Sequence, residues 1–126
     1  MRDDPKILNS ITRDELFDVL AREGYVPEKR KERSISTKMN STRVLFIVSE
    51  SQKNIQAYCA FRTDGTSLET VNEFNKNMRF AKAYLDDDKD PAVELDLDLD
   101  GGITEDRLID FITTVRILVT KFREHI

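Results

Sequence analysis

Two neighbouring segments of the chain show a period of two. In residues 80–85 the larger side chains Phe80, Lys82 and Tyr84 alternate with Ala81, Ala83 and Leu85, and in residues 92–100 hydrophobic and polar residues alternate strictly. In the second segment, valine and leucine take every other position and acidic residues stand between them. A period of two is typical of a strand with one buried face. Residues 86–91 are turn-forming, and Pro91 suits the first position of a strand because it cannot donate to a ladder. The pattern therefore predicts a β-hairpin.

The pairing of this hairpin follows from the alternation. A slip of one residue would turn the leucines toward water, so the parity of the register is constrained. We predict that Phe80 lies opposite Leu97 and that Tyr84 lies opposite Val93. A shift of two residues keeps the same parity, and the pattern does not distinguish between these two registers.

Three helices are predicted from apolar residues at three- and four-residue steps. Each begins after a hydroxyl side chain that can accept a hydrogen bond from a free amide of the first turn; these residues are Thr12, Ser67 and Thr104. Glu15 completes a capping box with Thr12. The last helix is the longest, and we expect it to cover one face of the sheet.

Two further strands are predicted in the first half of the chain. Residues 44–48 (VLFIV) are apolar on both faces, which is typical of a central strand, and residues 54–62 alternate. Antiparallel pairing of these strands would group Leu45, Ile47 and Tyr58 on one face. An exposed face this apolar normally marks an interface, so these three residues are candidate interface residues. The alternative is that the first helix crosses to this face and buries them.

Residues 27–43 have the least regular pattern. Residues 33–38 could form a strand at the sheet edge, where charges and Pro27 discourage unwanted pairing, and a flexible loop is the alternative. Residues 28–43 hold six basic against two acidic residues, whereas residues 86–110 hold eleven acidic against two basic residues. Such runs are usually solvated faces, but they could also steer a partner or orient two copies of the chain.

Composition limits the class of protein. The chain has 126 residues, which suits a single domain over residues 1–126. A net charge of −4 gives no support to nucleic acid or an anionic membrane as a partner. One cysteine excludes an internal disulfide, and no apolar run has the length of a membrane span. We expect a cytoplasmic protein.

One acidic motif resembles half of a calcium loop. Asp96, Asp98, Asp100 and Gly101 have the spacing that begins an EF-hand. The position of the bidentate glutamate, however, holds Arg107, which brings a cation where a ligand is needed. In a strand, alternate carboxylates also stand about 7 Å apart, too far for a compact cage. We interpret the motif as a solvated strand face and expect no bound metal or other cofactor.

Catalytic residue sets are missing from the sequence. Cys59 falls on an apolar strand face, and the single histidine, His125, has no second histidine or positioned base to form a metal site or a triad. Asn72 and Asn75, one helical turn apart, could line a ligand pocket or could satisfy backbone groups where the short helix ends and the strand begins. The second interpretation is favoured because it explains asparagine directly. We predict a protein without enzymatic activity.

With these residues in place, the chain from about residue 16 onward resembles the YbjN family, described as regulators of bacterial sensory transduction. The acidic leucine strand, the glycine pair after it and the amphipathic last helix belong to the resemblance. Many members have tryptophan where this chain has Phe74. The family signature is carried by Val71, Asn72, Phe74, Asn75, Arg79 and Phe80.

The resemblance implies an α+β fold similar to type III secretion chaperones, with helices on a twisted antiparallel sheet of about five strands. It implies no catalytic residues. We expect a non-enzymatic protein-binding module with a regulatory or chaperone-like role in bacterial signalling or secretion. The alternative is a sensor domain that responds to a small molecule or to calcium. The uncovered apolar face and the chaperone-like resemblance predict a homodimer; the identity of any other protein partner is open.

Overall fold

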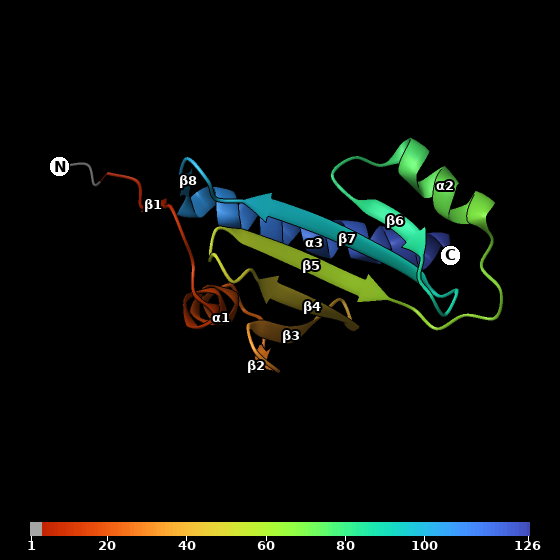
Figure 1. The fold of residues 1–126 in the computed structure, drawn as a ribbon, viewed down its shortest axis with the longest axis horizontal. Coiled ribbons are helices and arrows are strands. Elements are labelled where there is room, and N and C mark those ends of the chain that lie inside the picture. Colours follow the sequence, from red (N-terminus) through yellow and green to blue (C-terminus); the bar gives the residue numbers. More distant parts are fainter. Residues whose placement is uncertain (1–3) are drawn as a thin grey trace.

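A six-stranded antiparallel sheet with helices packed against it forms the body of the computed structural model, which describes residues 4–126 (Figure 1). The strand order is β2-β3-β4-β5-β7-β6. The strands are β2 (Glu28–Lys29), β3 (Ser34–Met39), β4 (Thr42–Val48), β5 (Asn54–Ala60), β6 (Lys82–Leu85) and β7 (Pro91–Asp98). Two short strands, β1 (Ile7–Leu8) and β8 (Ile103–Thr104), pair separately and fix the N-terminal segment.

The three helices begin where the hydroxyl caps predict. They are α1 (Arg13–Arg22), α2 (Leu68–Asn77) and α3 (Glu105–His125). Thr12 accepts from the amide of Glu15 at 3.1 Å, and the Glu15 carboxylate accepts from the amide of Thr12 at 3.0 Å, so the predicted capping box is present. The expected α+β fold is confirmed. Its sheet has six strands where about five were expected.

One face of the sheet carries the core. The Cα partners Ile35 and Phe46, and likewise Phe46 and Ala57, share this face and are fully buried or nearly so. The buried side chains of α1 and α3 join the same hydrophobic cluster. The strand residues of this cluster all point to the same face of the sheet. Because the buried side chains of α1 and α3 belong to the same cluster, both helices pack on this face. In Figure 1, α3 lies behind β5 and β7 along this layer.

Residues 33–38, for which the sequence allows an edge strand or a loop, contain most of β3, which spans Ser34–Met39 and lies between β2 and β4. Its register with β4 places Ile35 and Met39 in the core. The preceding charged stretch contributes only β2, a two-residue edge strand with both residues exposed. A short charged edge of this kind discourages pairing with other chains.

The predicted hairpin is present, but its predicted register is wrong by one residue. Tyr84 pairs with Ala92 rather than with Val93, and the core-facing partner of Val93 is Ala83. Phe80 is not in the strand, because β6 begins at Lys82. The buried face of this segment carries the small residue Ala83 and not the aromatic Tyr84.

Two local features explain the true register. Asp86 donates its amide to the carbonyl of Asp90 at 2.9 Å, which closes the turn and fixes the pairing that follows. At this edge α2 supplies the bulk of the core through Val71 and Phe74, so a small residue suffices at Ala83. Tyr84 therefore faces the other side of the sheet.

We predict that Phe74→Ala lowers the free energy of unfolding by about 3–5 kcal/mol, as aromatic truncations in cores do. The Phe74 side chain is 1% exposed, and its ring lies 4.9 Å from the ring of Phe122. Urea unfolding measures the loss. The matched control is Phe80→Ala, which should cost less than about 0.5 kcal/mol because Phe80 is 78% exposed. A loss below about 1 kcal/mol for Phe74→Ala would contradict this packing.

Candidate functional site

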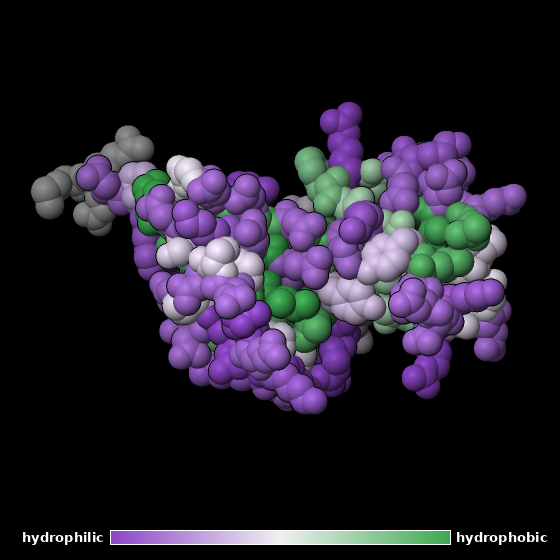
Figure 2. Space-filling view, viewed as in Figure 1, coloured by the Kyte–Doolittle hydropathy of each residue, from purple (hydrophilic) through white to green (hydrophobic). Residues whose placement is uncertain are grey.

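The face of the sheet opposite the core, here called the open face, is the main candidate site. Leu45 on β4 and Tyr58 on β5 are Cα partners on this face, and Ile47 stands two residues farther along β4. All three side chains are half-buried. Since α1 packs on the core face, it does not cross over to cover them. Figure 2 views the sheet from this side, and apolar and weakly polar side chains reach the surface among hydrophilic ones.

A polar network occupies the β6 side of the open face. The Tyr84 hydroxyl donates to Glu94 Oε1 at 2.5 Å, and Lys82 Nζ lies 3.0 Å from Glu94 Oε2. Burial, followed by the hydrogen bond to Glu94, raises the pKa of Tyr84. The pKa of Tyr58 is also raised, first by burial and then by the charges of Asp86 and Glu94. Both tyrosines therefore stay neutral hydrogen-bond donors at physiological pH.

A basic group occupies the β3 side of the same face. Arg30 donates through Nε to Ser36 Oγ at 2.8 Å, and Arg43 donates to the same oxygen at 3.4 Å. Ser36 itself is 3% exposed. A shallow groove of about 510 Å³ runs from this group to Leu45 and Tyr58. The open face thus combines an apolar middle with polar margins, which is the composition of a protein interface.

The signature residues lie at the junction of α2 and β6. Val71 and Phe74 are buried in the core. The Asn75 side chain donates to the carbonyl oxygen of Ala83 and accepts from its amide, each at 2.9 Å. This asparagine therefore takes the place of a neighbouring strand at the sheet edge. The interpretation favoured from the sequence, that an asparagine satisfies backbone groups at this junction, therefore holds for Asn75.

The remaining signature residues are exposed. Asn72 points to the surface beside a groove of about 550 Å³ between α2 and β6. Arg79 and Phe80 lie outside both elements, and Phe80 has a φ of 73°, a conformation uncommon for a residue other than glycine. The structure thus brings Val71, Phe74 and Asn75 together and separates Arg79 and Phe80 from them.

Cys59 is a packing residue in this geometry. It faces the core as the Cα partner of Val93 and is 3% exposed. Burial raises the pKa of its thiol to about 12. A thiol with such a raised pKa is a poor nucleophile, because the thiolate is the reactive form.

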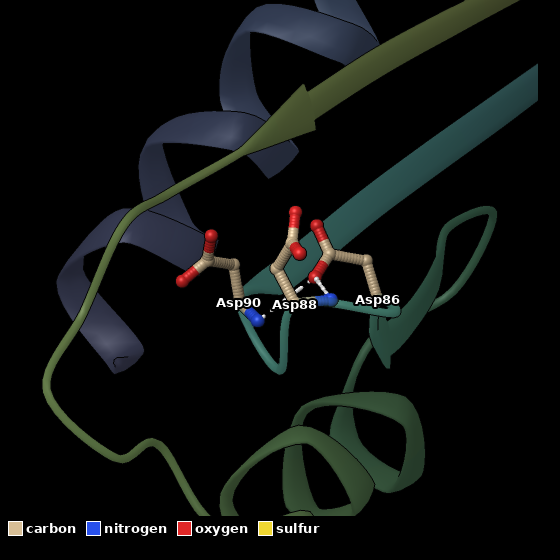
Figure 3. A group of neighbouring side chains, drawn as sticks. All are labelled: Asp86, Asp88 and Asp90. Carbon is tan, nitrogen blue, oxygen red and sulfur yellow. Dashed lines mark hydrogen bonds between the residues drawn. The ribbon is translucent and has the colours of Figure 1, made fainter.

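The carboxylates that gather in space are not those of the EF-hand-like motif. Among residues 4–126, one group of three offers ligand atoms within 4.8 Å of one another, and it consists of Asp86, Asp88 and Asp90 (Figure 3). The same every-second-residue spacing occurs at 96–100, but a turn draws the side chains together whereas a strand spreads them. Asp86 Oδ1 accepts from the amides of Asp88 and Asp90, each at 2.9 Å, so turn formation explains Asp86.

The fold and this surface define a class: α+β proteins with helices on one sheet face and a second face that is open. A family model named YbjN, with the description "putative bacterial sensory transduction regulator", matches residues 12–126. The chain belongs to the YbjN family. The sequence matches no curated protein.

Solved structures that share the fold include the following two. YbjN of E. coli, described as a "putative transcription regulator", has a TM-score of 0.77 and 14% identity, with 93% of this chain and 91% of that chain covered. An uncharacterized protein from Methanothermobacter thermautotrophicus has a TM-score of 0.56 and 17% identity, with 90% of this chain and 94% of that chain covered. At such identities the likeness concerns the fold alone. Within residues 4–126, no helix combines the length and the apolar character needed to cross a membrane.

We predict that Asn75→Ala lowers the free energy of unfolding by about 1–3 kcal/mol, because both backbone groups of Ala83 lose their partner. Asn72→Ala is the matched control on the same helix, and it should change stability by less than about 0.5 kcal/mol. Urea unfolding of the two variants provides the comparison. Equal effects would contradict a special role for the Asn75 side chain.

We also predict that calcium does not bind at micromolar concentration. A calcium site needs six to eight oxygen ligands, and the cluster Asp86–Asp88–Asp90 offers three carboxylates, one of which already holds the turn. Calorimetric titration should give no stoichiometric heat for the wild-type chain or for Asp88→Asn. A stoichiometric micromolar site that Asp88→Asn removes would show that the cluster is a calcium site after all.

Proposed function

We propose that this chain is a non-enzymatic regulatory module that binds protein through the open face of its sheet, and that it forms a homodimer there. The observation that carries the proposal is the position of Leu45, Ile47 and Tyr58, which stand together on a face that none of the packed helices covers. Central strands of a sheet are rarely left with an apolar outer face in a monomer. A two-fold pair, in which both copies use the same patch, is the commonest way to cover one.

The family description agrees with this proposal at a coarse level. A regulator acts by binding, and the YbjN family is described as a regulator of sensory transduction. A chaperone-like role, in which a dimer binds a protein client in the cytoplasm, is one form of such binding. The net charge of −4 argues against a general affinity for nucleic acid or for an anionic membrane. Fold similarity alone supports function weakly, so the proposal depends on the surface.

The alternative function is a sensor of small molecules. The groove between α2 and β6 is its candidate site, because it combines exposed Leu68 with the polar side chain of Asn72. A ligand that binds only the folded state would raise the melting temperature in proportion to its concentration. A thermal-shift screen of small metabolites therefore separates the sensor from the protein-binding module.

We predict that the wild-type chain sediments at micromolar concentration with about twice its mass of 14.6 kDa. Ile47→Glu should give a folded monomer, because the two-fold axis places the added charge in the interface twice. The matched control is Ile117→Glu on α3, which should remain a dimer because Ile117 is 41% exposed and lies on a helix of the other layer.

Two outcomes would overturn the proposed dimer. A wild-type monomer at high concentration would remove the need for a partner copy. Unfolding of Ile47→Glu, seen by circular dichroism while Ile117→Glu stays folded, would show that the open face belongs to the core.

A further inference from the structure

Two cations face each other on the open face without an anionic partner. Lys38 on β3 and Arg43 on β4 are Cα partners, and both are exposed. Within residues 4–126, neither forms an ion pair. Like charges placed directly opposite in a sheet are destabilising. We call this pair the basic strip.

Two anions on β7 lie on the opposite side of the open face from the basic strip. Asp96 is the Cα partner of Gln56, Asp98 is the Cα partner of Asn54, and both carboxylates are exposed on the open face. Neither forms an ion pair within residues 4–126, whereas their neighbour Glu94 is held by Lys82. We call Asp96 and Asp98 the acidic strip.

The registers place the apolar residues between the two strips. The row that contains Leu45 and Tyr58 lies next to the row of the basic strip, and the following row runs from Ile47 through Gln56 to Asp96. The basic strip on β3 and β4 and the acidic strip on β7 therefore occupy diagonally opposite corners of the open face. The midpoint of this diagonal falls on the apolar cluster of Leu45, Ile47 and Tyr58.

This arrangement is self-complementary. Consider a two-fold axis in the plane of the open face that passes through the apolar cluster and is perpendicular to the diagonal. Rotation about this axis carries each strip onto the position of the other. Two copies related by this axis bury the apolar cluster at the centre. They also place a basic strip against an acidic strip twice.

We propose that the occupant of the open face is a second copy of this chain, turned so that the basic strip of each copy meets the acidic strip of its partner. The inference rests on the proposed function and specifies the orientation of the dimer. Charge complementarity of this kind selects the partner and the register, and rejects arrangements that bring like charges together. It also accounts for two pairs of charges that the single chain leaves uncompensated.

Complementary charge reversal tests this orientation. Arg43→Glu and Asp96→Lys should each raise the dissociation constant of the homodimer by at least about tenfold, because an attraction becomes a repulsion at two symmetric contacts. A mixture of the two variants should form a heterodimer, which native mass spectrometry resolves by mass. The double variant Arg43→Glu/Asp96→Lys should regain the homodimer, because it restores opposite charges at both contacts.

The controls are charge reversals on the outer side of the other layer. Lys121→Glu and Glu124→Lys lie on α3 and are exposed, so they should leave the dissociation constant unchanged. If a charge reversal unfolds the chain, Arg43→Gln replaces it: the proposed orientation predicts a weaker dimer, whereas an orientation with like strips opposed predicts a tighter one. Raising the salt concentration should act in the same direction as Arg43→Gln.

The outcomes separate this inference from the proposed function. If Ile47→Glu dissociates the dimer while Arg43→Glu and Asp96→Lys leave it intact, the open face is the interface but the orientation is wrong. If the wild-type chain is a monomer, the proposed dimer and this inference both fail. Failure of the mixed variants to form a heterodimer, when each alone is a folded monomer, would also overturn the orientation.

Discussion

The structure depends on the parity of its strands. Apolar side chains of one parity, from Ile35 on β3 to Ala83 on β6, form one continuous surface, and the buried faces of α1 and α3 pack on it. Because a strand sends alternate side chains to opposite faces, this choice also decides which residues stand on the open face. The open face is therefore a direct consequence of the way the core is built.

This constraint explains what could be predicted from the sequence. The alternating leucines of β7 require one face to be buried, and their parity is as predicted. The hydroxyl caps at Thr12, Ser67 and Thr104 predict the helix starts because a cap needs only local chemistry. The grouping of Leu45 with Tyr58 was predictable for the same reason, since it needs only the pairing of neighbouring strands.

Features that depend on distant segments could not be predicted. In β6 the larger side chains indicated the wrong buried face, because α2, which precedes β6 in the chain, fills the core beside Ala83. Asparagine chemistry at the end of α2 indicated a backbone partner for Asn75, but the identity of that partner, Ala83 at the strand edge, depends on how α2 packs beside β6. The clustering of Asp86, Asp88 and Asp90 arises from the path of a turn, while the same spacing on β7 leaves carboxylates apart.

The proposed dimer would bury the open face, and the occupancy of this face in solution can be measured directly. Hydroxyl-radical footprinting, followed by mass spectrometry, reports the reactivity of individual side chains at several protein concentrations. We predict that Tyr58 and Leu45 lose reactivity as the concentration rises, while Ile117, which is 41% exposed and lies on α3 in the other layer, keeps its reactivity. Constant reactivity of Tyr58 and Leu45 at all concentrations would contradict the claim that this face is an interface between copies of the chain.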